Sequence, residues 1–115
     1  MLPRRNRRGQ GRGGEQDFSA ARSVELVLYV SAASPYGAAA TRNCESLLAR
    51  FDSKHVRLEV CDVSRDPDRA ETDGICFTPV LLKRYPLPRI YILGDLSNTT
   101  AIVDLLASCG VEPLR

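Results

Sequence analysis

The chain has 115 residues, of which 43% are hydrophobic and 26% are charged, a composition that fits one soluble globular domain. No apolar run approaches the roughly 20 residues that span a bilayer, which excludes a membrane helix, and the N-terminus lacks the apolar segment of a signal peptide. We therefore expect a cytoplasmic protein without membrane association.

The cysteines are spread along the chain without a C-x-x-C pair. They are Cys44, Cys61, Cys76 and Cys109, and His55 is the one histidine. This spacing excludes the usual zinc patterns and the dithiol redox pattern. We expect no metal site and no cofactor, and we interpret the cysteines as small, mostly buried apolar residues in a reducing compartment.

Charge divides the sequence into two parts. Residues 1–23 hold six arginines against two acidic residues, whereas the remainder of the chain has a net charge of −2. The first stretch, MLPRRNRRGQGRGG, has too few apolar residues to fold, so residues 1–23 are predicted to form a disordered basic arm. Such an arm can contact nucleic acid or an acidic protein, or it is a solvated leader or the product of an incorrectly chosen start codon. Because no aromatic residue lies in this stretch to stack on bases, we favour no nucleic-acid partner.

The folded domain is expected at residues 24–112, and it begins with a strand. Residues 24–30, VELVLYV, are apolar on both faces except at Glu25, which favours the middle of a covered sheet. Ser34 then caps a helix whose first turn begins with Pro35. The alternation in HVRLEVCDV predicts a second strand, parallel to the first through a right-handed crossover. The helix between them has one apolar face, formed by Ala40, Cys44, Leu47, Leu48 and Phe51.

The second half of the chain predicts two more strands between two helices. Asp66 and Pro67 begin a short helix that Gly74 ends. The segments TPVLLKRY and RIYILG are strand-like, and the proline-containing link between them suits a hairpin.

A last helix follows this hairpin. It is capped by Ser97 or Asn98, and Gly110 suits the position just after its end. Its apolar face is formed by Ile102, Leu105, Leu106 and Cys109.

The resulting order, β-α-β-α-β-β-α, is that of a thioredoxin-like α/β domain with a mixed sheet and helices on both faces. Thr78-Pro79 falls at the entry to the third strand, where thioredoxin-like domains have a cis proline. In redox thioredoxins the dithiol lies between the first strand and the first helix. Here that turn, SAASPYGA, contains no thiol.

Several segments together resemble the KaiB family of circadian clock proteins, over roughly residues 24–110. They are VLYV, the D-V-x-x-x-P-x-x-A-E-x-D-x-I pattern from Asp62 to Ile75, Thr78-Pro79, Pro86-Leu87-Pro88 and Gly94-Asp95-Leu96-Ser97-Asn98. Because the match is distributed over several motifs, no single short pattern decides it.

The resemblance implies a small non-enzymatic protein that binds a KaiC-type ATPase. KaiB proteins dock on the N-terminal ring of the KaiC hexamer, help to recruit or displace other clock proteins, and so modulate its phosphorylation cycle. A related domain is the sensor of a clock-linked histidine kinase, which makes such a kinase a further candidate partner. On the same basis, the candidate partner-binding residues are Arg57, Glu59, Asp73 and Lys83.

The resemblance also implies two folds. KaiB proteins adopt a self-associating form, dimeric or tetrameric, with the order β-α-β-β-α-α-β, and a thioredoxin-like monomer that binds KaiC. The change lies in the C-terminal half, so residues 77–98 are either a bistable element or an ordinary hairpin with a proline-rich link. The candidate switch residues are Thr78, Pro79, Pro86, Pro88, Gly94, Asp95 and Leu105.

The chain departs from the family pattern in its last helix. KaiB proteins usually have a glycine there, and an aspartate downstream, where this chain has AIVDLLASCG. Leu105 and Ala107 are good helix formers, so the local sequence favours the thioredoxin-like form. The basic arm is a second departure. Gly74, where the family often has a basic residue, is a third, and it weakens the expectation of KaiC binding.

A thiol- or glutathione-handling enzyme on a thioredoxin-like fold is the alternative function. A cysteine in the turn before the first helix would support it, and that turn has none. The sequence therefore favours a protein-binding module.

Overall fold

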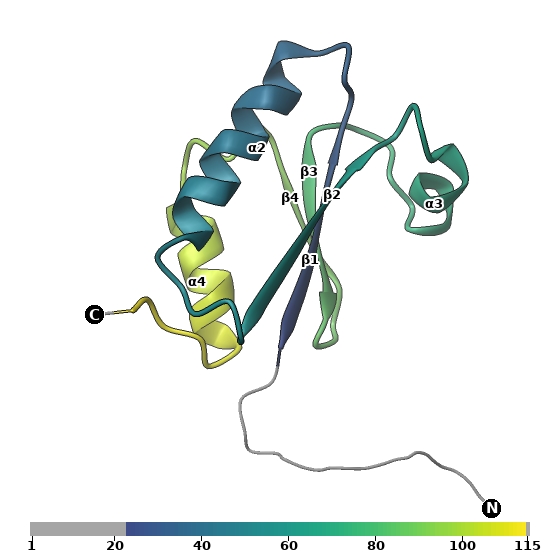
Figure 1. Ribbon diagram of the computed structural model, residues 1–115. Coiled ribbons are helices and arrows are strands. Elements are labelled where there is room, and N and C mark those ends of the chain that lie inside the picture. Colours follow the sequence, from purple (N-terminus) through teal and green to yellow (C-terminus); the bar gives the residue numbers. More distant parts are fainter. Residues whose placement is uncertain (1–22, 115) are drawn as a thin grey trace, which may run out of the picture.

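The computed structural model describes residues 23–114, so residues 1–22 of the predicted basic arm lie outside the described residues. The elements follow the predicted order β-α-β-α-β-β-α (Figure 1). They are β1 (Val24–Val30), α2 (Pro35–Leu48), β2 (Val56–Asp62), α3 (Pro67–Thr72), β3 (Val80–Tyr85), β4 (Ile90–Leu93) and α4 (Thr100–Ser108).

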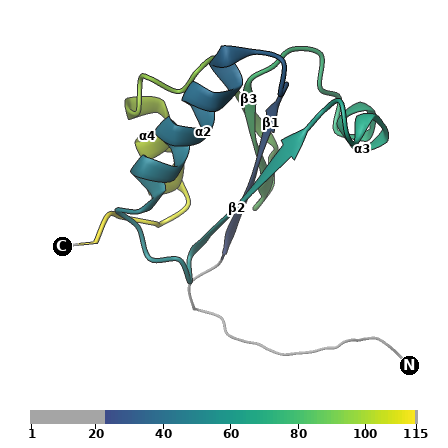
Figure 2. The same cartoon turned by 45° about the horizontal axis from the view of Figure 1, so that its top comes forward.

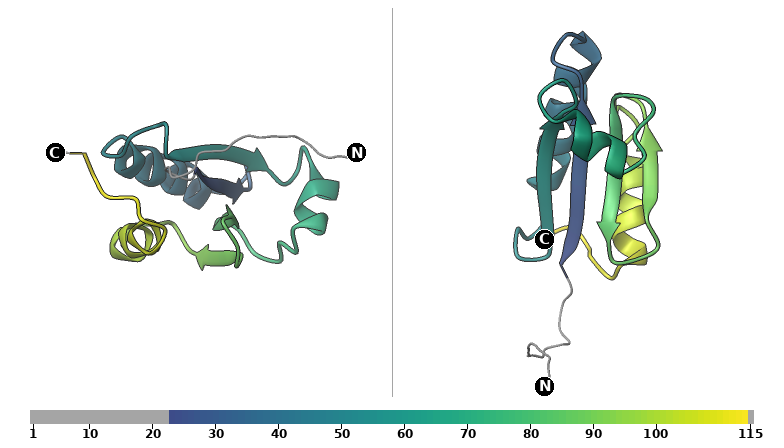
Figure 3. Two further views of the ribbon diagram at one scale, coloured as in Figure 1. Left: turned by 90° about the horizontal axis from the view of Figure 1, so that it is seen from below. Right: turned by 90° about the vertical axis from the view of Figure 1, so that its right-hand side faces the viewer.

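The strands form one mixed sheet in the order β2-β1-β3-β4. β1 pairs in parallel with β2 and antiparallel with β3, and β3 pairs antiparallel with β4. Helices α2 and α4 lie on one side of this sheet and α3 on the other (Figure 2, Figure 3). The predicted α/β class, the mixed sheet and the helices on both faces are confirmed, and the order seen here is the thioredoxin-like one.

β1 is the central strand that its apolar sequence predicts, and all its side chains are buried except that of Glu25. Leu26 and Leu28 belong to the core beneath α2 and α4, whereas Val27 and Tyr29 belong to a smaller core on the α3 side. Because consecutive side chains of a strand point to opposite faces, β1 contributes to two cores at once.

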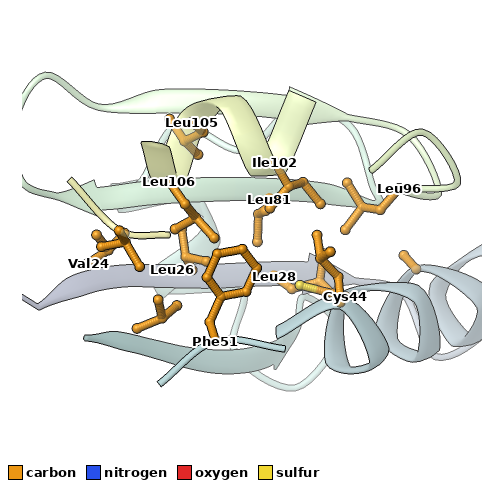
Figure 4. Packing of buried hydrophobic residues seen from close by; sticks show 14 of the residues in the cluster. Val24, Leu26, Leu28, Cys44, Phe51, Leu81, Leu96, Ile102, Leu105 and Leu106 are labelled. Carbon is orange, nitrogen blue, oxygen red and sulfur yellow. The ribbon is translucent and has the colours of Figure 1, made fainter. Parts of the chain in front are cut away.

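The larger core lies between the sheet and helices α2 and α4 (Figure 4). Ser34 caps α2 as predicted, with its Oγ accepting a hydrogen bond of 3.2 Å from the Tyr36 amide. The helices contribute Ala40, Cys44 and Leu47 from α2, and Ile102, Leu105 and Leu106 from α4. Burial of each leucine-sized side chain stabilises the fold by about 1.5–3 kcal/mol, which fixes both helices on this face.

β2 departs from the simple alternation that its sequence predicts. Val56 is buried and Leu58 is half-buried, but Val60 is exposed. In the part of the chain that the structure describes, β2 is an edge strand that pairs with β1 alone, so its far end has less cover than the central strand.

α4 begins later than the sequence indicates. It starts at Thr100 with Thr99 at the cap position, not at Ser97 or Asn98. Asn98 still serves the helix, because its Oδ1 accepts a hydrogen bond of 3.1 Å from the Thr100 amide. The helix ends as predicted before Gly110, whose φ of 82° is left-handed and favours glycine.

Candidate protein-binding site

Asp73, a predicted partner-binding residue, is 2% exposed and follows the last residue of α3. Its Oδ2 accepts a hydrogen bond of 2.5 Å from the Tyr29 hydroxyl, which lies on β1. Tyr91 on β4 donates a hydrogen bond of 2.8 Å to the Asp73 main-chain carbonyl. Asp73 therefore joins the end of α3 to two strands of the sheet.

Two arginines balance the charge of this buried carboxylate. Arg89 Nη1 lies 3.3 Å from Asp73 Oδ1, and Arg84 Nε lies 3.9 Å from Oδ2. A buried charge without such partners costs several kcal/mol of desolvation. We call Tyr29, Asp73, Arg84, Arg89 and Tyr91 the Asp73 network.

The electrostatics of the Asp73 network keep Tyr29 neutral. Burial, reinforced by the hydrogen bond to Asp73 and by its negative charge, raises the pKa of the Tyr29 hydroxyl far above its usual value. Tyr29 therefore stays a hydrogen-bond donor at neutral pH. Because its side chain is buried and fully engaged, Asp73 holds this fold together and offers no surface for direct contact with a partner.

Lys83, another predicted partner-binding residue, is also buried, with 3% of its surface exposed. It lies on β3, and its Nζ is 3.9 Å from the Cys109 sulfur just after α4. In this fold its position, like that of Asp73, is internal rather than on a contact surface.

Arg57 and Glu59 remain at the surface of β2. Glu59 makes a bidentate ion pair with Arg69 of α3, in which Arg69 Nη2 donates to Oε1 at 2.6 Å and Nη1 donates to Oε2. The hydrogen bond from Arg69 lowers the pKa of Glu59, which keeps it ionised. Arg57 and Glu59 also line a hollow of about 120 Å³ that includes Glu25 and Arg84, so charges of both signs meet there.

An apolar surface lies beside β4, on the same face of the sheet as α3. It surrounds a hollow of about 180 Å³, and we call it the β4 surface. Its members are Gly74, Ile75, Cys76, Phe77, Val80, Tyr91 and Leu93. Phe77 is 71% exposed, Leu93 64% and Tyr91 44%. Uncharged, exposed apolar side chains gathered around a hollow are typical of a protein-binding surface.

Three of the predicted switch residues, Thr78, Pro79 and Gly94, lie next to residues of this surface. The Thr78–Pro79 bond is cis, as predicted, and directly follows Phe77. The Pro79 carbonyl accepts a hydrogen bond of 3.0 Å from the Gly94 amide, which extends the β3–β4 ladder by one step. This backbone hydrogen bond therefore joins the segment before β3, which carries Phe77, to the segment that follows β4.

The link between β3 and β4 contains two further switch candidates, Pro86 and Pro88. It forms the predicted hairpin, with Lys83 opposite Ile90 in the last registered pair. Leu87, between the two prolines, is exposed. The hairpin therefore places a further apolar side chain at the surface, at the end of the sheet away from Phe77.

The segment after β4 attaches the hairpin to the helical layer. Gly94 has a φ of 108°, a conformation that favours glycine. The Asp95 carbonyl accepts a hydrogen bond of 2.9 Å from Asn43 of α2, and its carboxylate accepts one of 3.0 Å from the Ser97 amide. Leu105, the last switch candidate, is buried against the sheet on α4.

The thiols do not form a redox site of the thioredoxin kind. The turn before α2 has none, and Cys44, the nearest, is fully buried on α2. Burial raises the pKa of the Cys44 thiol to about 11. A thiol in that state is protonated at neutral pH and is a poor nucleophile.

Within residues 23–114 the structure contains neither a cluster of metal ligands nor a membrane-spanning helix. In that range no three histidine, cysteine, aspartate or glutamate side chains are placed to hold a metal ion. None of the helices described is long and apolar enough to cross a membrane.

The KaiB domain model matches residues 27–107. The chain belongs to the KaiB family. The circadian clock protein KaiB3 of Synechocystis is 32% identical over 80 residues, which covers 70% of this chain and 78% of that protein. The circadian clock oscillator protein KaiB of Thermosynechococcus vestitus is 37% identical over 84 residues, with the same shares covered.

Solved structures agree on the fold of this KaiB-family chain. The N-terminal domain of SasA from Synechococcus elongatus has a TM-score of 0.62 at 22% identity, over 78% of this chain and 86% of that one. Mitochondrial thioredoxin 3 of Saccharomyces cerevisiae has a TM-score of 0.63 at 18% identity, over 76% and 79%. At these identities the likeness concerns the fold alone, and it confirms the thioredoxin-like architecture.

The β4 surface and the Asp73 network are not evident from the order of residues along the chain. The signal for the β4 surface lies in RIYILG, where Ile90 and Ile92 alternate with Tyr91 and Leu93, so both faces of the strand are apolar. Only one of these faces packs against the larger core. The Asp73 network had no local signal, because Tyr29 and Asp73 are 44 positions apart in the KaiB domain.

Proposed function

We propose that this chain is a non-enzymatic, cytoplasmic regulatory protein that binds a KaiC-type ATPase ring in the fold described above. Binding modulates the phosphorylation cycle of the ring and the recruitment of its partners. The observation that carries this proposal is the match to the KaiB domain over residues 27–107. A clock-linked histidine kinase is a further partner, and the fold shared with the SasA N-terminal domain supports it.

The β4 surface is the proposed contact with the ATPase. Phe77 and Leu93 are the most exposed side chains around its hollow, and burying such anchors in a partner's pocket contributes most of the affinity of many interfaces. Arg57 and Glu59, exposed on β2, are proposed to lie at the charged rim and to influence partner choice more than affinity. Asp73 supports this surface from inside the fold through its hydrogen bond with Tyr91, whereas Lys83 contacts Cys109 on the α4 side of the sheet.

Self-association into the other KaiB fold is the proposed means of regulation. The C-terminal half contains the predicted switch residues. The backbone conformation at two positions in this half also supports a change of fold there. Gly94 and Leu96 have φ values of 108° and 64°, and the left-handed region is unfavourable for a leucine. In this proposal the thioredoxin-like monomer is the more populated state in dilute solution, and assembly at high concentration favours the other fold.

Co-elution with a KaiC-type ATPase, first with ATP and then with ADP bound, tests the main proposal. The double variant Phe77→Ala/Leu93→Ala should weaken binding by roughly 10- to 100-fold, because loss of two anchors costs about 1–3 kcal/mol. Tyr36→Ala is the matched control, since Tyr36 is equally exposed at 64% but lies on α2. Absence of binding in both nucleotide states would contradict the proposed function, and equal loss in Tyr36→Ala would contradict the proposed surface.

The enzyme alternative is tested by reduction of insulin disulfides. We expect no reduction above the buffer rate, because the turn before α2 has no thiol and Cys44 is buried. Reduction that disappears in Cys44→Ala would restore the thiol-handling function.

A further inference from the structure

Lys83 and Cys109 form a contact that the proposed function does not use. Lys83 Nζ lies 3.9 Å from Cys109 Sγ, although the two residues are 26 positions apart, on β3 and just after α4. Lys83 is 3% exposed, whereas Cys109 is partly exposed. Cys109 therefore lies partly at the surface, while its sulfur contacts a buried amine.

The surroundings of Lys83 are unusual for a lysine. Lysine side chains are almost never fully buried unless a carboxylate pairs with them. Within residues 23–114, the ion pairs involve His55 and three arginines but not Lys83. The hydrogen-bond partner found for its amine in that range is the thiol of Cys109. A buried, otherwise unpaired amine is thus directed at a sulfur atom.

The remaining cysteines and the second lysine provide internal comparisons. Cys76 is more exposed than Cys109, but the contact of its thiol is the Gly74 carbonyl at 3.8 Å. Cys44 and Cys61 are both buried. Lys54, the other lysine of the chain, lies on the surface in the turn before β2. Contact between an accessible thiol and a buried amine therefore singles out Cys109 and Lys83.

We propose that Cys109 and Lys83 are a site of oxidative modification, at which hydrogen peroxide or another hydroperoxide converts their contact into a covalent sulfur–nitrogen link. In the first step the Cys109 sulfur bonds to one peroxide oxygen and the O–O bond breaks. The thiol proton leaves with the other oxygen, as water when the peroxide is hydrogen peroxide. The product is a sulfenic acid, so the sulfur is oxidised and the peroxide is reduced.

In the second step the Lys83 amine, after it gives a proton to solvent, attacks the sulfenic sulfur. The S–N bond forms, the S–O bond breaks, and the hydroxyl leaves with an amine hydrogen as water. One thiol, one amine and one hydrogen peroxide thus give one sulfenamide and two waters. The rotatable bonds of the lysine side chain allow the two atoms to approach from their present distance.

The link would join β3 to the end of α4 covalently. Such a cross-link limits the freedom of the unfolded chain between its two ends, which includes the hairpin and the β4 strand. This modification does not depend on binding of an ATPase, so failure of either proposal leaves the other intact.

Treatment of the full chain with hydrogen peroxide, followed by blocking of free thiols and peptide mass mapping, tests the site. Before blocking, the product should be about 2 Da lighter than the reduced chain, and the digest should contain one cross-linked peptide with both Lys83 and Cys109. Trypsin should no longer cleave after Lys83, while cleavage after Lys54 continues. A thiol reductant should restore the original mass and the cleavage.

Matched variants separate this link from other oxidation products. Cys109→Ser should abolish the cross-linked peptide, and Cys76→Ser should leave it unchanged. Cys109 is partly exposed, so its serine variant keeps the fold more readily than a variant of the buried Lys83. A disulfide as the lighter product, or oxygen added to Cys109 with the Lys83 peptide unaltered, would overturn the proposal.

Discussion

The N-terminal half, from β1 to β2, and the C-terminal half, from α3 to α4, are held together by different means. In the N-terminal half, two strands of seven residues pair in parallel beneath a helix of 14 residues with a continuous buried stripe. In the C-terminal half the strands have six and four residues, and the helices six and nine. There the buried residue Asp73 connects the end of α3 to β1 and β4 through hydrogen bonds.

This difference indicates which half of the molecule contains the proposed binding surface. Phe77 and Leu93 lie in the C-terminal half and remain exposed, so their apolar area does not stabilise the monomer. Because these exposed side chains do not stabilise it, the C-terminal half depends more on the packing of α4 and on the Asp73 network. Changes to these two features should therefore have the largest effects.

Leu105→Gly should have the largest effect. Leu105 is buried on α4, and the change removes a core side chain and places a glycine inside a helix. We expect a loss of about 3–5 kcal/mol in the free energy of unfolding, measured by urea titration. Backbone chemical shifts over residues 100–108 should lose their helical values, and sizing should show larger species if the other fold takes over.

Ala107→Gly is the control, because Ala107 is exposed and its loss should cost only about 1 kcal/mol of helix propensity. The unmodified chain at micromolar concentration should be monomeric with helical shifts over residues 100–108. Strand-like shifts there would show that packing between chains overrides the local preference for a helix.

Asp73→Ala should have the next largest effect. The change leaves the buried Tyr29 hydroxyl without its acceptor and two arginines without their shared anion. We expect a loss of about 2–4 kcal/mol. Hydrogen exchange should show faster opening in β3 and β4 than in β1 and β2. Asp68→Ala, at an exposed position on α3, should change stability by less than about 0.5 kcal/mol. Uniform loss of protection across both halves would contradict the comparison.

Alkaline pH should weaken the N-terminal half through Cys44. The pKa of this thiol is raised to about 11 in the folded chain, so the unfolded chain releases the proton at lower pH. This contribution to stability is complete below about pH 8 and is lost as pH rises towards 11, with about 1–2 kcal/mol lost by pH 10. Unfolding titrations between pH 7 and 10 measure the slope, and Cys44→Ala should make it shallower. An unchanged slope would show that other groups cause the pH dependence.

The ion pair between Glu59 and Arg69 should have the smallest effect, although it connects the two halves. Glu59 is 56% exposed, so solvent screens the pair, and a double-mutant cycle with glutamine should give about 0.2–1 kcal/mol. The pKa of Glu59 is lowered, so this stabilisation is present above about pH 4.3 and disappears as pH falls through its folded pKa. It should also shrink in high salt. A coupling that is large and insensitive to salt would show a tighter connection between the halves.

Local signals in the sequence determined most of the fold. The apolar run of β1, the Ser34 and Asp66 caps, the proline-containing hairpin and Gly110 each depend on residues within a few positions of one another. They predicted the seven described elements in the correct order, and the two differences from the predicted elements were small. The start of α4 shifted to Thr100, and the exposure of Val60 reflects an edge position that no short pattern reports.

The site was decided by the tertiary structure. The resemblance to KaiB proteins predicted Asp73 and Lys83 as partner-binding residues, but folding brought Tyr29 and two arginines to Asp73 and the Cys109 thiol to Lys83. In the same way Phe77 and Leu93 are apolar, which by itself suggests burial, yet among residues 23–114 no element covers them. The burial of a side chain depends on which distant elements pack over it. Hydrophobicity along the chain therefore predicts burial only where the neighbouring strands and helices are already known.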